Sequence, residues 1–363
     1  HWVALRLPDG TISAFANQGR IGTFPTDDPD NCLYSEGMDT FAAERGWYDP
    51  ADGPFNWREA FHPATAQQKR YTATRVWSIY RRAAPSQQFS PDYHRGVAGA
   101  EPYPLWIRPD RKLTLADVFA LKRDHYEGTA IDMTEGVDAG PGAYPLRWRP
   151  MGFEVDGEQY TWERPISTQQ TGFSMVCQSR AWLPDPVGGV TWYGLDDTDF
   201  TCYMPLYCSI EALPVSYETG SLGAFSWDSA WWVFNFVSNY AMLRYDAMIQ
   251  DVRAAQSDIE GTFLDLQPAV EATAAELART DPQLMRRYLT DYSVQHAELV
   301  TKRWRELGEH LLTTYNDGYV KNAEGRPEEQ GYPEAWLRAV LRQRPDQFRL
   351  PEDAARLAEP EDY

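Results

Sequence analysis

A carboxamide and a guanidinium group near the beginning of the sequence have the chemistry to stabilise negative charge. Asn17 ends a stretch in which apolar and polar residues alternate, and Arg20 follows three positions later. A carboxamide N–H donates to the oxyanion that forms during acyl transfer, and a guanidinium binds a carboxylate through two hydrogen bonds. Asparagine is also a common turn residue. Local spacing alone therefore favours a turn-capping role for Asn17.

A second guanidinium group, that of Arg75, lies in the segment Thr74-Arg75-Val76-Trp77. An arginine in such a segment is most often a structural salt-bridge partner. Residues 73–82 alternate between apolar and basic character, so this segment is compatible with a strand or with a helix. The residues alone therefore favour a structural role for Arg75.

Three further polar residues have the chemistry to contact a substrate. A carboxylate at Glu127 or at Asp132 would receive an ammonium group, although Asp132 fits the capping of its own loop at Thr134 equally well. Gln170 belongs to a polar run within a predicted apolar strand, and would either line a cleft or face water. The pattern leaves both interpretations of each residue open.

Other catalytic chemistries have no matching motif. The sequence contains no G-x-S-x-G, no H-E-x-x-H, no P-loop and no G-x-G-x-x-G. Its four cysteines show no C-x-x-C pairing and no histidine at zinc-ligand spacing, so we expect buried thiols and neither zinc nor a disulfide framework. These cysteines are Cys32, Cys177, Cys202 and Cys208. We therefore predict no metal and no organic cofactor.

Composition describes a large globular chain with an acidic surface. The 363 residues suffice for one large domain or two, with 43% hydrophobic and 14% aromatic residues. The 53 acidic and 34 basic residues give a net charge of −19, which argues against nucleic acid and anionic membranes as partners.

The most apolar segment, residues 227–243, is interrupted by Asp228 and two asparagines, so we expect no membrane span. We expect a secreted or cell-envelope location rather than a cytoplasmic one.

The first elements that must position these residues are a hairpin and two helices. Pro8-Asp9-Gly10 is a turn tripeptide between apolar runs, which predicts a β-hairpin over residues 2–17. A short helix is predicted over Asp39–Arg45. A second helix over Leu113–Tyr126 starts at Thr114, which has Asp117 at capping-box spacing.

The centre of the chain predicts an antiparallel sheet, and its last third predicts helices. Strands are expected at Ser167–Trp182, Val190–Leu195 and Phe200–Tyr207, in a meander covered on both faces. The periodicity then changes to that of helices, and the tail from Arg349 is charged. The helices are expected at Ala230–Ala255, Pro282–Tyr315 and Glu334–Gln343. Strands followed by helices indicate an α+β fold.

Several blocks together resemble one known family. They are Ile12–Ile21, Arg75–Arg81, His125–Thr129 with Asp132, and Ile166–Asp197. In this order they resemble bacterial dipeptidases of the cysteine-type N-terminal-nucleophile (Ntn) hydrolase superfamily, of the dipeptidase A type. The resemblance runs from His1 to about Arg244. It implies a layered αββα fold with antiparallel sheets, a core over residues 1–255, and a C-terminal helical extension over 256–363 that packs on the core.

The resemblance also implies roles for the candidate residues. In such enzymes a cysteine thiol attacks the substrate and its own α-amino group acts as the base. By motif position, Asn17 would donate to the oxyanion and Arg75 would lie beside the nucleophile. By their own chemistry, Arg20 is a candidate to anchor the carboxylate of such a substrate, and Asp132, Glu127 and Gln170 are candidates to contact the rest of it. Asp132 would alternatively orient Arg75. A homo-oligomer without cofactor is implied.

The sequence departs from the family pattern at its beginning, and this departure leaves alternative activities open. Family members begin upstream and carry the nucleophilic cysteine at a processed N-terminus, whereas this sequence opens with His1. We expect an upstream segment or separate chain that completes the sheet and ends in a cysteine near Asn17. One alternative is an Ntn amidase acting on N-acyl substrates such as penicillin V or bile salts, which would need an apolar slot. The other is a non-catalytic peptide-binding or structural subunit.

Overall fold

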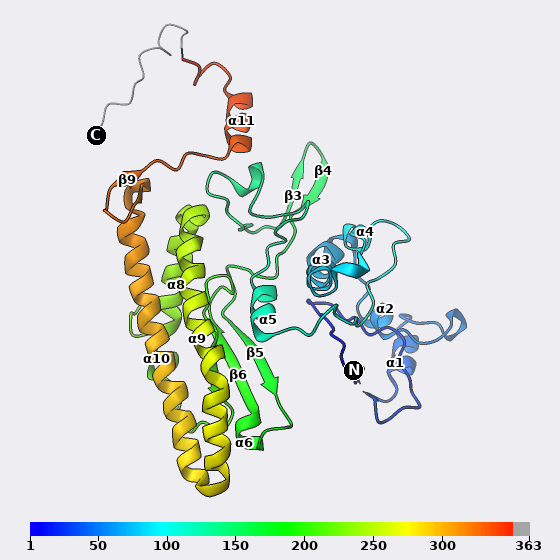
Figure 1. Ribbon diagram of the computed structural model, residues 1–363. Helices are drawn as coiled ribbons and strands as arrows, with labels where there is room; N and C mark the ends of the chain where they lie inside the picture. The colour runs from blue at the N-terminus through cyan, green and yellow to red at the C-terminus, as the bar shows by residue number, and fades with distance from the viewer. Residues whose placement is uncertain (351–363) are drawn as a thin grey trace. The chain divides into compact units, whose positions relative to one another are not determined.

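Helices and small antiparallel sheets make up the structure, a computed structural model that describes residues 1–350 (Figure 1). The fold class is therefore α+β, as predicted. The chain forms two compact units. Unit 1 contains His1–Ile131 and Arg147–Thr168, and unit 2 contains Asp132–Leu146 and the chain from Gln169 onward. The predicted boundary at residue 255 stays a prediction; that residue lies within a long helix of unit 2.

Unit 1 is built from short strands and helices around one long helix, α3. Its strands are β1 (Val3–Leu5), β2 (Cys32–Tyr34), β3 (Gly152–Val155) and β4 (Glu158–Thr161). Its α-helices are α1 (Met38–Glu44), α2 (Trp57–Phe61), α3 (Ala66–Ala83), α4 (Asp92–Arg95) and α5 (Leu115–Lys122), with 3₁₀ turns η1 (Pro50–Asp52) and η2 (Pro85–Gln87). The helices predicted near residues 39–45 and 113–126 are thus confirmed as α1 and α5. The predicted cap of α5 is also present, since Thr114 and Asp117 form a capping box.

The predicted opening hairpin is wrong, although its turn exists. Thr11 N donates to Pro8 O at 3.3 Å, and Gly10 has a φ of 73°. However, β1 pairs with β2, and Ile12 instead forms an isolated bridge with Ile107. Turn residues specify a reversal of the chain, but the partner of each strand is chosen by contacts that are distant in sequence. Residues 11–17 therefore run as an extended segment outside any hairpin.

The extended segment packs its apolar side against α3. Ala14 and Ala16 are buried in one cluster with Ala73, Val76 and Tyr80. The three α3 residues recur at helical spacing, so residues 73–82 form a helix rather than a strand. Helix α3 begins with a capping box in which Thr65 and Gln68 satisfy each other's backbone N–H groups. This packing places the end of the extended segment beside the middle of α3.

Unit 2 combines a three-stranded sheet with three long helices. Its strands are β5 (Phe173–Ser179), β6 (Gly189–Leu195), β7 (Met204–Tyr207), β8 (Val320–Lys321) and β9 (Pro327–Glu328). Its α-helices are α6 (Asp185–Gly188), α7 (Val215–Glu218), α8 (Ala230–Ala241), α9 (Tyr245–Thr280), α10 (Pro282–Thr314) and α11 (Glu334–Gln343). Its 3₁₀ turns are η3 (Val137–Ala139), η4 (Met242–Arg244) and η5 (Asn316–Gly318).

The order β5-β6-β7 is antiparallel throughout, which confirms the predicted meander. The first strand is shorter than predicted, because it begins at Phe173, opposite Leu195. Asp196 follows Leu195 with a φ of 61°, which ends β6. Asp196 N still donates to Gly172 O at 3.0 Å, but the chain before Gly172 has no strand to pair with. The polar run that contains Gln170 therefore lies outside the sheet.

Helices α8, α9 and α10 pack together and against the sheet (Figure 1). Trp304 of α10 stacks on Phe234 of α8 with ring centroids 5.0 Å apart. One face of the sheet buries Trp192, whereas Phe173 and Met175 on the other face are 56% and 49% exposed. The prediction of a sheet covered on both faces is therefore wrong for the described chain at these positions.

The predicted helices of the last third are largely confirmed. The expected helix over 230–255 is divided by η4, so that α8 ends at Ala241 and α9 begins at Tyr245. Helices α10 and α11 match the predicted segments closely. The charged tail predicted from Arg349 falls mostly on residues 351–363, outside the described residues. Within residues 1–350, no helix has both the length and the apolar character that crossing a bilayer requires.

One buried carboxyl group in unit 2 should make the stability of the protein depend on pH. Asp196 is 2% exposed, and burial raises its pKa to about 7, although Asn235 Nδ2 donates to its Oδ1 at 2.9 Å. The unfolded chain releases this proton near pH 4. Because the folded protein retains the proton between these pH values, the contribution to stability is present below pH 4 and is lost as the pH rises to 7.

We expect the free energy of unfolding to fall by about 2–4 kcal/mol between pH 5 and pH 8 from this group, and Asp196→Asn to remove most of that fall. Urea unfolding at both pH values measures the difference. Asp265→Asn, at an exposed position in α9, is the control and should keep the wild-type difference. An unchanged difference in Asp196→Asn would show that another group causes it.

Candidate functional site

Asn17 and Arg75 contact each other directly. Nη2 of Arg75 donates to Oδ1 of Asn17 at 2.9 Å and lies 3.5 Å from the carbonyl oxygen of Ala16. Nε of Arg75 donates to the carbonyl oxygen of Tyr71, four residues earlier in α3, at 2.9 Å. The guanidinium group is thus held by its own helix and reaches the end of the extended segment.

The local sequence explains how Asn17 reaches this position. Ala16 is buried, whereas Asn17 is exposed and has a φ of 55°. Asparagine adopts this left-handed conformation more readily than most residues. Gly19 then packs so closely on Trp57 that an added Cβ would lie 2.5 Å from the ring. The buried Ala16 therefore holds the chain before the bend at Asn17, and the packing of Gly19 on Trp57 holds the chain after it.

The contact determines which end of the Asn17 amide remains available. A guanidinium has only donors, so the amide atom that faces Arg75 must be the oxygen. The Nδ2 group then becomes the outward donor, and it has no hydrogen-bond partner among residues 1–350. A donor that is oriented before substrate arrives stabilises a developing oxyanion without a reorganisation cost. This geometry suits an oxyanion-hole donor.

The charge of Arg75 persists at neutral pH. Burial lowers its pKa to about 10, Tyr126 raises it, and Arg164 lowers it. Tyr126 is fully buried, has a φ of 68°, and donates its hydroxyl to the carbonyl oxygen of Arg164 at 2.5 Å. Arg75 therefore remains a cation at neutral pH.

Arg20 is occupied by backbone carbonyl groups. Its Nη1 donates to Ala14 O at 2.6 Å, and its Nη2 donates to Pro104 O at 2.6 Å and to Tyr103 O at 2.9 Å. The hydroxyl of Tyr80 is a further acceptor at 3.1 Å. Arg20 thus fastens the extended segment to a distant loop, and we leave it out of the substrate site proposed below.

Replacing Arg20 should destabilise unit 1. Arg20→Gln leaves at least two carbonyl groups without their charged donor, so we expect the free energy of unfolding to fall by about 2–4 kcal/mol. Chemical denaturation measures this loss. Arg6→Gln, at an exposed arginine of the same unit, should change stability by less than about 0.5 kcal/mol. Equal effects of the two substitutions would contradict the assigned role.

Glu127 keeps a negative charge near the end of α5. Burial would raise its pKa, but hydrogen bonds and the charge of His125 outweigh burial and lower it to about 2. The Glu127 carboxylate accepts from the backbone N–H of His125 at 2.8 Å and lies 3.3 Å from its Nδ1. The side chain is 42% exposed, so this carboxylate can still reach solvent.

Asp132 and Gln170 belong to unit 2, whereas Asn17 and Arg75 belong to unit 1. Oδ1 of Asp132 accepts from the backbone N–H of Thr134 at 2.9 Å and from its hydroxyl at 2.7 Å. This is the loop-capping arrangement that the sequence offered as one interpretation. Gln170 is exposed in a turn. Their contacts with substrate remain predictions.

The sequence pattern does not predict that Tyr71 and Tyr126 interact with Arg75. Tyr71 is recognisable only once the segment is known to be helical, because its carbonyl oxygen lies one turn before Arg75. Tyr126 comes from a segment about 50 residues later. Its burial beside Arg75 depends on the tertiary fold.

The cysteines and acidic residues form no metal site in the described chain. Residues 1–350 contain no group of three His, Cys, Asp or Glu side chains that would hold a metal ion. Cys32 and Cys202 are buried, as predicted, whereas Cys177 and Cys208 are exposed. The prediction of burial is therefore wrong for the latter two, which lie on the outer face of β5 and just after β7.

Comparison with known proteins places this chain in a family. A family model described as Peptidase family C69 matches residues 1–258. A probable dipeptidase of Salmonella dublin is 28% identical over 222 residues, 61% of this chain and 45% of that protein. A probable dipeptidase of Latilactobacillus sakei is 29% identical over 218 residues, with 60% and 41% covered. Dipeptidase A of Lactobacillus helveticus is 25% identical over 219 residues, with 60% and 41% covered.

The matched region thus spans less than half the length of each of these relatives. The family-model match over residues 1–258 includes the extended segment and α3 of unit 1 and the sheet of unit 2. Because the family model covers well over half of this chain, the chain belongs to Peptidase family C69.

Proposed function

We propose that this chain carries the oxyanion-stabilising part of a dipeptidase that acts through a cysteine acyl-enzyme. Nδ2 of Asn17 donates to the oxyanion of the tetrahedral intermediate. Arg75 holds the amide in this orientation and places a positive charge beside the attacking thiolate. The nucleophile is a cysteine outside residues 1–363, at the processed N-terminus of an upstream segment or separate chain.

The observation that carries this proposal is the contact of 2.9 Å between Arg75 and Asn17. It joins two residues that lie 58 positions apart in the sequence. It also directs Nδ2 of Asn17 away from the guanidinium group of Arg75. The names of the relatives support a dipeptide as the substrate. Glu127, which stays ionised at neutral pH, is proposed to receive the ammonium group of that dipeptide.

The proposed reaction proceeds in two steps. The thiol transfers its proton to the α-amino group of the same cysteine while its sulfur attacks the peptide carbonyl carbon, so that the carbonyl oxygen becomes an oxyanion. The carbon–nitrogen bond breaks, and the leaving amine takes the proton from that ammonium group. Water then adds to the thioester, which releases the acid and regenerates the thiol. Asn17 acts in both steps because each forms an oxyanion.

The αββα layering of Ntn hydrolases belongs to the same proposal. Its support is the asymmetry of the β5-β6-β7 sheet, which packs helices on one face and exposes Phe173 and Met175 on the other. A second sheet from the upstream segment would cover these apolar side chains. The homo-oligomeric state and the secreted or cell-envelope location stay predictions from the sequence.

N-terminal sequencing and intact-mass measurement of the protein purified from its natural source test the proposal. We expect an additional segment or chain that starts with cysteine, together with dipeptide hydrolysis that iodoacetamide abolishes. N-acetylated dipeptides serve as the control substrate and should be poor, because they lack the ammonium group. Faster cleavage of the N-acyl substrates would favour an acylase, and dipeptide hydrolysis that is insensitive to thiol reagents would overturn the mechanism.

A further inference from the structure

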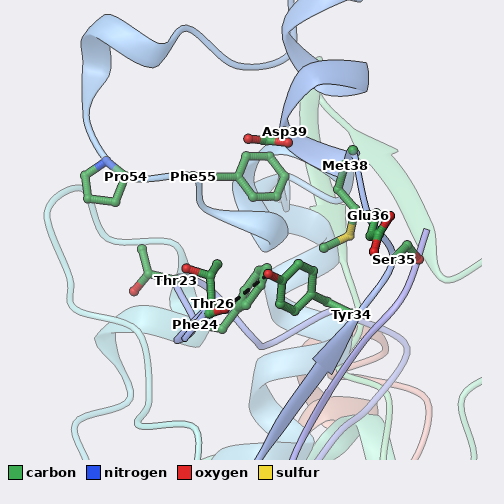
Figure 2. A pocket seen from close by; sticks show the side chains of 11 residues that line it. Thr23, Phe24, Thr26, Tyr34, Ser35, Glu36, Met38, Asp39, Pro54 and Phe55 are labelled. Carbon is green, nitrogen blue, oxygen red and sulfur yellow. Dashed lines mark hydrogen bonds between the residues drawn. The ribbon is translucent and has the colours of Figure 1, made fainter. Parts of the chain in front are cut away.

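Unit 1 contains a hollow of about 470 Å³ that the proposed reaction does not use (Figure 2). It lies between residues 23–26, the end of β2, the start of α1 and the loop at Pro54 and Phe55. Its volume falls in the usual range of small-molecule sites. None of its lining residues is Asn17 or Arg75.

Aromatic rings form one continuous wall of this hollow. The ring centroid of Phe24 lies 5.3 Å from that of Tyr34 and 6.5 Å from that of Phe55. Phe55 also contacts Tyr48, with ring centroids 5.1 Å apart. Figure 2 shows Met38 beside these rings, and its side chain is buried. The wall is therefore rigid, apolar and rich in π-electron density.

The charged groups at this hollow are all negative. Glu36 and Asp39 line it, and no lysine, arginine or histidine does. Neither carboxylate forms an ion pair with another residue of the described chain. Gly37, with a φ of 70°, turns the chain between the two residues as β2 passes into α1. Figure 2 shows both side chains at the same end of the hollow as Met38.

We infer that this hollow binds a small organic cation, an ammonium group joined to an apolar body. Aromatic faces attract such cations through their quadrupoles, and the two carboxylates add the complementary charge. A neutral apolar ligand would gain nothing from Glu36 and Asp39. A hard metal ion needs six or more oxygen ligands, whereas this wall is mostly carbon. The site is separate from the Asn17–Arg75 pair, so it does not rest on the proposed dipeptidase activity.

A titration of the protein with phenethylammonium tests the inference. Calorimetry and NMR measure the binding. We expect saturable binding with a Kd on the order of 1 mM, which is typical of a small exposed cation–π site. Phenethyl alcohol has nearly the same shape but no charge, and should bind at least about tenfold more weakly. Equal binding of the two probes would overturn the inference.

Variants of the lining residues locate the site. Glu36→Gln combined with Asp39→Asn should weaken phenethylammonium binding by about tenfold, and Phe55→Leu should weaken it by about five- to tenfold. Glu44→Gln, in the same helix as Asp39 but outside the hollow, is the matched control and should bind like the wild type. Circular dichroism confirms that each variant is folded.

Binding that survives in the folded double variant would overturn the inference. Asn17→Ala separates the two proposals, because it should lower kcat for dipeptide hydrolysis by about two to three orders of magnitude while keeping the affinity for phenethylammonium. If the cation fails to bind while dipeptide hydrolysis still depends on Asn17, only the present inference fails. If the cation binds but hydrolysis does not depend on Asn17, only the proposed function fails.

Discussion

Replacing Asn17 by alanine should lower kcat for dipeptide hydrolysis by two to three orders of magnitude and change KM by less than about threefold. Removal of one oxyanion-hole donor has an effect of this size, because the lost hydrogen bond is stronger in the transition state than with bound substrate. Steady-state kinetics of the active protein measure both constants. The substitution removes an exposed side chain, so the protein should still fold, although alanine at a φ of 55° lowers the free energy of unfolding by about 1–2 kcal/mol.

Two further variants make this result specific. Asn17→Asp keeps the shape but replaces the donor by a carboxylate, so it should be at least as inactive as Asn17→Ala. Asn31→Ala, at another exposed asparagine of unit 1, should retain wild-type kcat. A kcat for Asn17→Ala within about threefold of the wild type would show that this amide does not stabilise the oxyanion.

Replacing Arg75 should have the second largest effect. Arg75→Lys keeps the charge, but its compact ammonium lacks the two separate nitrogens through which the guanidinium donates to Tyr71 O and to Asn17 Oδ1. We therefore expect kcat to fall by about 10- to 100-fold in Arg75→Lys. In Arg75→Met, which also loses the charge beside the nucleophile, we expect a fall of about 100- to 1,000-fold.

Kinetics as a function of pH distinguish positioning from simple loss of structure. Arg75→Met should raise the pKa that limits kcat/KM on the acidic side, because the nucleophile loses a neighbouring cation. Arg70→Lys, five residues earlier in α3 and paired with Glu163 at 2.8 Å, is the matched control and should leave kcat unchanged. A pH profile identical to that of the wild type in Arg75→Met would contradict a role of Arg75 beside the thiolate.

The pairing of Asn17 and Arg75 was predictable from the sequence only through the family resemblance. Spacing by itself favoured a turn role for one residue and a salt bridge for the other. The geometry then depends on the burial of Ala14 and Ala16 against α3, which is a contact between distant segments. No local pattern encodes which helix receives the apolar side of an extended segment.

Features set by local chemistry were predicted most accurately. The capping box of α5 and the bounds of α10 and α11 depend on residues within a few positions of each other. The opening hairpin failed because its turn is local but its strand partner is not. The contacts of Arg20 were unpredictable for the same reason, since its acceptors at Tyr103 and Pro104 lie more than 80 residues away.

The central claim is that Arg75 orients the Asn17 amide toward an oxyanion. A dipeptide aldehyde forms a tetrahedral adduct with a thiol, so its inhibition constant reports the stabilisation of that oxyanion directly. We predict that Asn17→Ala and Arg75→Met each weaken aldehyde inhibition by at least about 100-fold and change the affinity for the dipeptide product by less than threefold. Equal affinities of the wild type and both variants for the aldehyde would contradict the account.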